Sequence, residues 1–204
     1  ALDVTITTSN WNGYEVQCHG GSNGTANISI NGANGPYTKI VLDVLLDTIH
    51  NTLSNTITGL GAGMYHFHII DVNECLYEET IIYQEPTAIT HSFVINHVTC
   101  TGWNNGSITW NGSGGVGSAA TYSYFWSTGA TTYSINGLAA DTFAIRVTDL
   151  NGCYSFAEPI VNGDNVLDAS IGSSQNPSCW NYCDGEIEVL PSGGAPNINS
   201  SGNP

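Results

Sequence analysis

Hydrophobic and polar residues alternate in short runs along most of the chain, and the period of this alternation is two. The pattern is clearest in residues 57–75 and 135–153, which align with each other without a gap. In the first stretch Tyr65, Phe67 and Ile69 are apolar and the residues between them are histidines. A period of two places alternate side chains on opposite faces of a β-strand, whereas an amphipathic helix needs about 3.6 residues. The chain is therefore predicted to be all-β, with these three side chains facing a core.

The chain contains an internal repeat of about 80 residues. A cysteine opens each copy, at Cys18, Cys100 and Cys179, and the intervals are 82 and 79 residues. Asn-Gly or Asp-Gly, the strongest short turn signal, stands just before the next expected strand in every copy. Self-similarity at such a period indicates tandem modules.

Each complete module is predicted to have six strands, which correspond to A, B, C, E, F and G of an immunoglobulin-like β-sandwich. In the first module they lie near 2–8, 25–31, 37–42, 56–60, 64–70 and 76–83. In the second they lie near 88–95, 107–111, 122–127, 134–138, 142–148 and 154–161. We therefore expect tandem immunoglobulin-like repeats at 1–86 and 87–164, followed by the N-terminal half of a third at 165–204.

Two core features distinguish the modules. Trp126 on the expected strand C is predicted to fill the space between the sheets, where the first module has Val41. The run Leu60-x-x-Gly63-x-Tyr65 has the form of a tyrosine corner, in which a phenol hydroxyl binds the backbone. The second module has Phe143 in place of this tyrosine, so we expect a looser corner there.

Composition narrows the class of partner. The chain has 204 residues, of which two are basic and 17 acidic, so its formal net charge is −15. Such a chain repels phosphate backbones and anionic lipid, which excludes nucleic acid and membrane surfaces as partners. The most apolar stretch, 40–49, contains two aspartates and is far shorter than the roughly 20 residues of a membrane span. Six cysteines in a chain poor in charge favour an oxidising, extracellular setting.

The second module resembles the SprB-type repeat of gliding-motility adhesins and other giant surface proteins of Bacteroidota. The resemblance rests on Cys100, Gly114-Gly115, Tyr-x-Tyr-x-Trp-Ser-x-Gly at 122–129, and Asp-x-Asn-Gly-Cys at 149–153. The first module lacks the Trp-Ser-x-Gly piece. The resemblance implies an exported protein of the outer cell surface, delivered by type IX secretion, whose modules form a filament. It also implies neighbouring repeats, other filament subunits and secretion or motility machinery as partners.

Each complete module places one cysteine between strands A and B and one in the F–G turn. Pairing within a module would join Cys18 to Cys75 and Cys100 to Cys153. In immunoglobulin topology these connections lie at opposite ends, about 17–20 Å apart, whereas a disulfide needs Cα atoms within about 7 Å. A head-to-tail array favours Cys18–Cys153 instead, with Cys75 and Cys100 pairing with neighbouring repeats. Pairing within a module and free thiols are the alternatives.

Cys179 and Cys183 have C-x3-C spacing, which fits a small local disulfide loop better than half a zinc site, because no second Cys/His pair follows. His66 and His68 share the outward face of the expected strand F. Two such imidazoles can hold a metal, but exposed strand residues are the favoured interpretation.

Two aspartate–asparagine pairs resemble the start of a calcium loop, Asp71 with Asn73 and Asp149 with Asn151. Neither continues to a distal glutamate, so an Asx-type F–G turn is favoured and calcium is the weaker alternative. No other cofactor is expected. Thr48 lies in an Asp-Thr-Ile triplet of the kind that Bacteroidota use for O-glycosylation, which follows from the resemblance alone.

The function predicted from these patterns is a structural stalk or filament segment of a secreted adhesin for gliding motility or surface adhesion. No catalytic residue is expected, because neither a His-Glu-x-x-His motif nor paired carboxylates in a cleft pattern occur. The first alternative is a polysaccharide-binding module that stacks sugars on Trp11, Trp103 and Trp180, although these side chains could equally pack against the next domain. The second is an ancillary part of a larger secreted enzyme.

Overall fold

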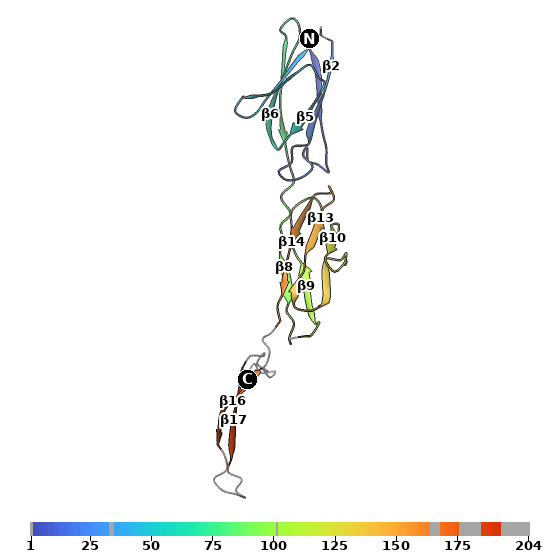
Figure 1. The fold of residues 1–204 in the computed structure, drawn as a ribbon. Helices are drawn as coiled ribbons and strands as arrows, with labels where there is room; N and C mark the ends of the chain where they lie inside the picture. Colours follow the sequence, from blue (N-terminus) through green and yellow to red (C-terminus); the bar gives the residue numbers. More distant parts are fainter. Residues whose placement is uncertain (1, 33–34, 101, 164–167, 176–184, 193–204) are drawn as a thin grey trace, which may run out of the picture. The chain divides into compact units, whose positions relative to one another are not determined.

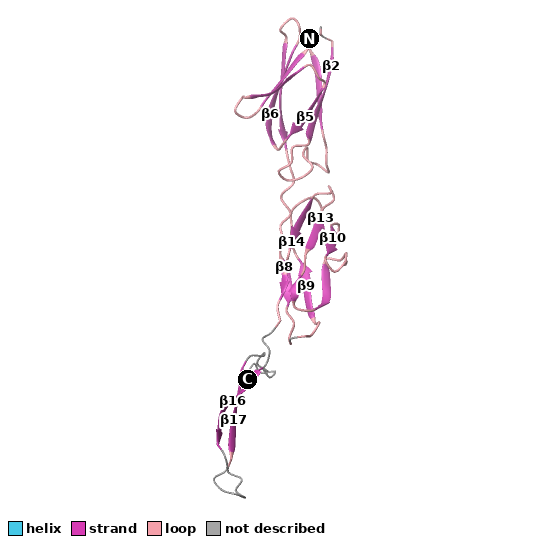
Figure 2. Cartoon of the chain, viewed as in Figure 1, coloured by secondary structure: helices cyan, strands magenta, loops and turns pink. Residues whose placement is uncertain are grey.

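The structure of the chain is a computed structural model that describes residues 2–32, 35–100, 102–163, 168–175 and 185–192 (Figure 1). Every regular element in these ranges is a β-strand, as Figure 2 shows. The all-β prediction is therefore confirmed. None of the described residues forms a helix of the length and hydrophobicity that a bilayer crossing requires.

The chain divides into two compact units, called unit 1 and unit 2 below. Unit 1 is made of Ala1–Thr90, Gly112–Ser123 and Val147–Ser155. Unit 2 is made of His91–Asn111, Tyr124–Arg146 and Phe156–Pro204. Unit 1 thus includes residues 87–90 and two further segments that the sequence pattern assigns to the second module. The limits of the three sequence modules stay a prediction.

The first module folds into two antiparallel sheets, with strand orders β1-β2-β5 and β4-β3-β6-β7. The strands of the first sheet are β1 (Asp3–Thr8), β2 (Gly24–Asn31) and β5 (Thr56–Leu60). Those of the second are β3 (Thr38–Leu42), β4 (Thr48–Thr52), β6 (Gly63–Ile70) and β7 (Leu76–Tyr83). In immunoglobulin lettering the sheets are A-B-E and C′-C-F-G, which confirms the immunoglobulin-like fold.

The core of this sandwich lies between its two sheets. Ile28 and Ile57 come from one sheet and Val41, Phe67 and Ile69 from the other, and each is at most 3% exposed. Burial of a side chain of this kind contributes about 1.5–3 kcal/mol relative to exposure. The two-residue period of the sequence therefore identified the buried face of strand F correctly.

Strand β4 is a correction to the sequence analysis, which expected no strand between C and E. It forms because a tight turn brings Thr48–Thr52 back along β3. In that turn Asp43 Oδ1 accepts the backbone N–H groups of Leu45 at 2.9 Å and of Asp47 at 3.0 Å. The strand carries no clear hydrophobic alternation, since it pairs at the outer edge of the sheet, and that is why the pattern missed it.

The second module repeats the strand order. One sheet has the order β11-β9-β8 and another β10-β13-β14, which correspond to E-B-A and C-F-G. The strands of the first are β8 (Phe93–Asn96), β9 (Gly106–Trp110) and β11 (Ser134–Leu138). Those of the second are β10 (Ser123–Trp126), β13 (Ile145–Thr148) and β14 (Tyr154–Ala157). A short extra pair joins β12 (Asp141–Thr142) to β15 (Ile160–Val161).

The E–F corners of the two modules differ as their sequences suggest. Tyr65 Oη donates a hydrogen bond to the carbonyl oxygen of Gly61 at 3.2 Å, so the tyrosine corner is present. In the second module Phe143 has no hydroxyl to offer, and strand F is interrupted there between β12 and β13. The backbone N–H of Phe143 instead donates to Pro159 O at 3.0 Å. Trp126 is fully buried, and its Nε1 donates to Thr132 O at 2.8 Å.

Beyond residue 167 the described part of the chain is one antiparallel strand pair. It consists of β16 (Asp168–Gln175) and β17 (Glu186–Ser192). The residues of β17 are all exposed.

Candidate functional site around the Cys18–Cys153 disulfide

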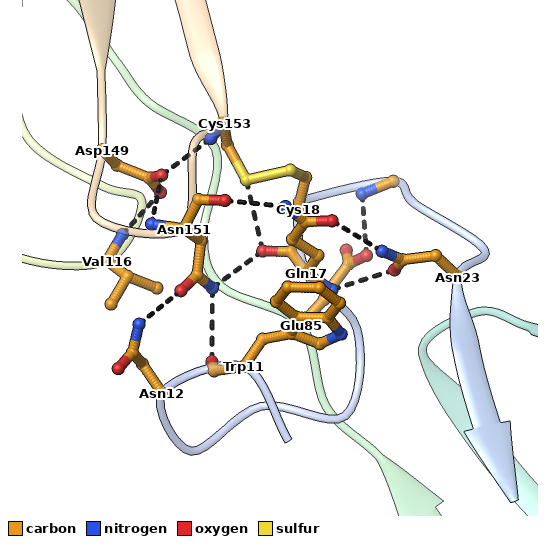
Figure 3. Close-up of a disulfide and its surroundings, with 11 residues drawn as sticks. Trp11, Asn12, Gln17, Cys18, Asn23, Glu85, Val116, Asp149, Asn151 and Cys153 are labelled. Atoms are coloured by element: carbon orange, nitrogen blue, oxygen red, sulfur yellow. Dashed lines mark hydrogen bonds between the residues drawn. A yellow bond between two sulfur atoms is a disulfide. The ribbon is translucent and has the colours of Figure 1, made fainter. Parts of the chain in front are cut away.

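A disulfide joins Cys18 to Cys153, which lie 135 residues apart in sequence (Figure 3). Their Cα atoms are 5.6 Å apart, within the range that a disulfide requires. Both residues belong to unit 1. This is the pairing that the topological argument favoured, and it covalently links the A–B connection of the first sequence module to the F–G turn of the second.

The F–G turn that carries Cys153 is organised by one carboxylate. Asp149 Oδ1 accepts the backbone N–H groups of Asn151 at 2.9 Å and of Cys153 at 2.8 Å. Asp149 Oδ2 accepts the N–H of Val116 at 2.8 Å. Gly152 has a φ of 82°, a left-handed conformation in which glycine carries no steric cost. The aspartate thus folds the turn and ties it to a neighbouring loop, as an Asx-type turn does.

Asn151 connects this turn to the loop that precedes Cys18. Its Nδ2 donates to Gln17 O at 3.0 Å and to Trp11 O at 3.2 Å. Its Oδ1 accepts from Asn12 Nδ2 at 2.6 Å, and its backbone carbonyl accepts from Gln17 Nε2 at 2.7 Å. The residue is only 8% exposed, and both its amide nitrogen and its amide oxygen are hydrogen-bonded to the loop. Sequence reasoning had named Asn151 only as a weak calcium candidate and missed this role.

The loop around Cys18 is held by contacts of its own. Gln17 N donates to Asn23 Oδ1 at 3.0 Å, and Asn23 Nδ2 donates back to Gln17 Oε1 at 2.8 Å. A Cβ on Gly24, which follows this asparagine, would lie 2.6 Å from Leu60 O. The Asn-Gly pair is therefore required by close backbone packing as well as by the turn.

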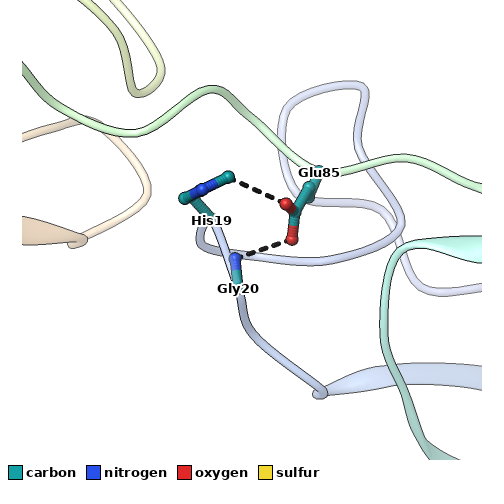
Figure 4. A network of polar contacts seen from close by, with 3 residues as sticks. All are labelled: His19, Gly20 and Glu85. Atoms are coloured by element: carbon teal, nitrogen blue, oxygen red, sulfur yellow. Dashed lines mark hydrogen bonds and ion pairs between the residues drawn. The ribbon is translucent and has the colours of Figure 1, made fainter.

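The segment that follows β7 also contacts the loop around Cys18 (Figure 4). Glu85 Oε1 lies 2.8 Å from His19 Nδ1, and Glu85 Oε2 accepts the backbone N–H of Gly20 at 2.7 Å. Glu15 acts in the same way, since its Oε2 accepts the N–H of Gln84 at 2.8 Å. Acidic residues here serve as acceptors for backbone and imidazole groups.

The stretch Gly20-Gly-Ser22-Asn-Gly24 has the Gly-x-Ser-x-Gly spacing of a hydrolase nucleophile elbow. The elbow requires a sharp strand-to-helix turn, whereas Ser22 stands in the loop that leads into β2. Within the described residues no hydrogen bond links Ser22 to His19. The spacing therefore lacks the strand-to-helix turn of a nucleophile elbow.

The remaining cysteine candidates divide into two groups. Cys75 and Cys100 are free and exposed. Cys179 and Cys183 lie outside the described residues, as does Trp180. The other two tryptophans of the proposed sugar platform are Trp11, which is 37% exposed, and Trp103, which is 58% exposed.

The calcium and metal candidates have protein partners. Asp71 Oδ1 accepts the N–H groups of Asn73 and Cys75 at 2.8 and 2.9 Å, and these hydrogen bonds, the one from Cys75 first, hold the pKa of Asp71 below its usual value. His66 Nδ1 lies 2.9 Å from Thr80 Oγ1, and His68 Nε2 lies 3.3 Å from Glu78 Oε1, each across the β6–β7 pair. Among the described residues no group of three His, Cys, Asp or Glu side chains is arranged to hold a metal.

Thr48 is the first residue of β4 and is exposed on the outer strand of its sheet. An exposed hydroxyl at an edge is accessible to a modifying enzyme. O-glycosylation of Thr48 stays a prediction.

Comparison with known proteins gives one family match. Residues 92–131 match the family model described as SprB repeat, which confirms the resemblance for that part of the chain. No match to a curated protein sequence was found. One similar solved structure contains the three N-terminal domains of the highly immunogenic outer capsid protein Hoc of bacteriophage RB49. It aligns with 15% identity and a TM-score of 0.45, and the alignment covers 100% of this chain and 72% of that one. A C-terminal 282-residue fragment of intimin, in complex with the intimin-binding domain of the translocated intimin receptor, has 15% identity and a TM-score of 0.45, with 82% and 66% covered.

Proposed function

From the SprB repeat matched at residues 92–131, we propose that the chain is a segment of a secreted, cell-surface adhesin-type protein and acts there as a structural stalk. In this role the immunoglobulin-like modules hold a more distal part of the protein away from the cell. The role is non-catalytic. Gliding motility and adhesion to surfaces are the two settings that the family resemblance implies.

The observation that carries the proposal is the covalent bond between Cys18 and Cys153. A disulfide of this kind persists in oxidising compartments outside the cytosol, which supports an extracellular location. The bond links two sequence modules, whereas a module that only binds a ligand has no need of a covalent link to its neighbour. The hydrogen bonds of Asn151 add specificity to the same connection.

The acidic surface supports the same role. With a net charge of −15, copies of the chain that lie side by side repel one another, and such repulsion keeps proteins soluble at high local density. This property suits a molecule displayed in many copies on a cell.

A replacement experiment in the cells that make the protein tests the stalk role. Residues 1–204 are deleted in one strain and exchanged in another for unrelated immunoglobulin-like domains of equal total length. We expect the deletion to reduce surface attachment or gliding, and the exchange to restore it, because a spacer depends on length and not on surface chemistry. Antibody labelling of intact cells reports in parallel whether the segment is displayed outside.

A specific ligand-binding role predicts a different result. If the unrelated domains are displayed normally but do not restore attachment, the stalk role is wrong. Loss of attachment on Trp103→Ala, whose side chain is 58% exposed, would then support the polysaccharide-binding alternative. A Trp11→Ala variant extends the test to the other described tryptophan of the proposed sugar platform.

A further inference from the structure

The structural elements around the disulfide occur twice in the chain. Two five-residue turns, 71–75 and 149–153, each run from an aspartate to a cysteine, and we call them the cysteine turns. Two loops, 16–24 and 98–106, each run from a valine through a cysteine to an Asn-Gly pair, and we call them the cysteine loops; residue 101 of the second lies outside the described residues. One turn and one loop are joined to each other, and the second turn and the second loop are not.

The two cysteine turns have the same internal geometry. In each, the aspartate Oδ1 accepts the backbone N–H groups of the asparagine and the cysteine, at 2.8 and 2.9 Å around Asp71 and at 2.9 and 2.8 Å around Asp149. The fourth residue has a positive φ in both, 61° at Glu74 and 82° at Gly152. The turn 71–75 therefore presents its asparagine and cysteine on the same backbone frame as the joined turn.

The two cysteine loops also match. The asparagine of the Asn-Gly pair exchanges two hydrogen bonds with the residue before the cysteine, at 3.0 and 2.8 Å between Asn23 and Gln17 and at 3.2 and 2.8 Å between Asn105 and Thr99.

The valine that opens each loop is buried in the same way. Val16 is 0% and Val98 is 1% exposed. Its N–H donates to a carbonyl near the end of the module, Gln84 O at 3.0 Å and Asn162 O at 3.1 Å respectively. The described residues of loop 98–106 thus follow the same plan as the loop that holds Cys153.

We propose that the exposed cysteine turn 71–75 of one copy of this chain docks into the exposed cysteine loop 98–106 of a second copy, and that a Cys75–Cys100 disulfide seals the contact. The inference rests on the proposed stalk function and extends it to association between copies of the chain. Because the turn and the loop are different surfaces, the contact is heterologous, and each copy in a joined pair keeps a free turn or a free loop for a further copy.

The joined pair shows which contacts the docking would use. Gln17 O accepts a hydrogen bond from Asn151 Nδ2 at 3.0 Å, and Cys153 Sγ, which carries no hydrogen in the disulfide, lies 3.2 Å from the same oxygen. Thr99 occupies the place of Gln17 in the free loop, and Asn73 occupies the place of Asn151 in the free turn. The carbonyl and the amide that form the central hydrogen bond are therefore both present.

One part of the joined site has no counterpart. Seven residues separate the end of β1 from Val16, and they include Trp11 and Asn12, whereas a single residue separates β8 from Val98. Docking into loop 98–106 thus offers Asn73 one carbonyl acceptor where Asn151 has two. We expect the Cys75–Cys100 contact to be weaker than the joined one and to depend more on the covalent bond.

The bond forms by thiol–disulfide exchange with oxidised glutathione or another small disulfide. The Cys75 thiolate attacks the glutathione disulfide and releases one reduced glutathione. The Cys100 thiolate then attacks the mixed disulfide, which releases the second. The two cysteines lose two electrons and two protons, and the small disulfide gains them.

The test uses two variants of the full chain, Cys75→Ser and Cys100→Ser, one of them labelled with nitrogen-15. They are mixed in a glutathione buffer, and the disulfide-linked peptides are identified by mass spectrometry. Since each variant keeps one of the two cysteines, a Cys75–Cys100 peptide must join two molecules. If docking occurs, the Cys75–Cys100 peptide should exceed both the Cys75–Cys75 and the Cys100–Cys100 peptide by roughly tenfold or more. Random pairing gives an excess of about twofold.

A second comparison tests the role of the turn. Asn73→Asp, placed in the Cys100→Ser chain, replaces the amide donor by an acceptor and should lower the Cys75–Cys100 yield several-fold. Asn51→Asp on β4 introduces the same charge at an exposed site and should leave the yield unchanged. Random proportions of the three products overturn the inference, as does an absence of linkage in a sample where Cys18–Cys153 has formed. Neither result bears on the stalk function, which the replacement experiment tests separately.

Discussion

The substitution Asn151→Asp isolates the hydrogen bonds that hold the turn 149–153 against the loop before Cys18. The two side chains have nearly the same shape, and the bond from Asn12 to Oδ1 survives the change. The two N–H donors are lost, and a carboxylate oxygen then faces the carbonyl oxygens of Trp11 and Gln17 at about the distances of the original bonds, 3.2 and 3.0 Å.

The size of the effect follows from those two bonds. A hydrogen bond of this kind contributes a net 0.5–1.5 kcal/mol or so, and the loss of both therefore costs about 1–3 kcal/mol. A loss of about 1–3 kcal/mol corresponds to a roughly 5- to 150-fold change in an equilibrium constant. The repulsion between the carboxylate and the two carbonyl oxygens acts in the same direction.

The equilibrium between the Cys18–Cys153 disulfide and glutathione is the appropriate assay, because contacts that keep the two cysteines together favour the closed form. The chain is equilibrated in buffers with graded ratios of reduced to oxidised glutathione, and free thiols are then trapped by alkylation. The disulfide-linked Cys18–Cys153 peptide and the alkylated peptides of the reduced form are quantified. We expect the equilibrium constant for disulfide formation to fall by roughly 5- to 150-fold in Asn151→Asp.

The same substitution in the free cysteine turn is the matched control. Asn73 is exposed and occupies the same turn position, so Asn73→Asp adds the same charge without removing a contact from the joined site. It should leave the Cys18–Cys153 equilibrium within about twofold. If Asn151→Asp also stays within twofold of the parent, the amide does not hold the loops together and the reasoning fails.

Three further predictions concern the sandwiches themselves. Tyr65→Phe removes a hydroxyl that donates to a backbone carbonyl at 3.2 Å and should lower the free energy of unfolding by about 0.5–1.5 kcal/mol in urea titrations; an unchanged midpoint would contradict a stabilising tyrosine corner. Trp126→Ala empties a fully buried position and should cost about 3–5 kcal/mol, whereas Trp103→Ala at an exposed one should cost about 0.5 kcal/mol or less by the same measurement. Burial holds the pKa of His91 below its ordinary value, so the unfolded chain binds the proton more tightly and stability should fall as the pH drops below about 6.5. His91→Gln, which leaves the indole of Trp110 a partner to donate to, should flatten that part of the pH–stability profile, and an unaltered slope would rule out His91 as its cause.

The strand pattern and the buried face could be predicted because both follow from local periodicity. Phe67 and Ile69 alternate with histidines, and a one-residue shift would have placed those histidines in the core. The Cys18–Cys153 pairing could be predicted for a different reason. Immunoglobulin topology separates the A–B and F–G connections of one module by a strand length. In both cases a geometric rule acts on residues that the sequence displays directly.

The role of Asn151 could not be predicted in this way. Its partners, Trp11 and Gln17, stand 140 and 134 residues away in sequence. They are backbone carbonyls, which no sequence pattern distinguishes from any other carbonyl. The one available signal was that the same Asp-x-Asn-x-Cys turn occurs twice. The role of its asparagine becomes clear only from the structure, in which one of the two turns is joined to the loop before Cys18. Strand β4 was missed for a related reason, because edge pairing needs no hydrophobic alternation.

The position of the Cys18–Cys153 bond in the chain also determines how the protein responds to tension. A pull applied at the two termini passes through the disulfide and bypasses the covalent loop of residues between the two cysteines, which are 135 positions apart. At about 3.3–3.6 Å per extended residue, the bond withholds roughly 450–490 Å of contour length. Unfolding of the sandwich cores within that loop therefore does not lengthen the chain. Only chemical reduction releases the stored length, so the reach of the molecule is set by the redox state of its surroundings.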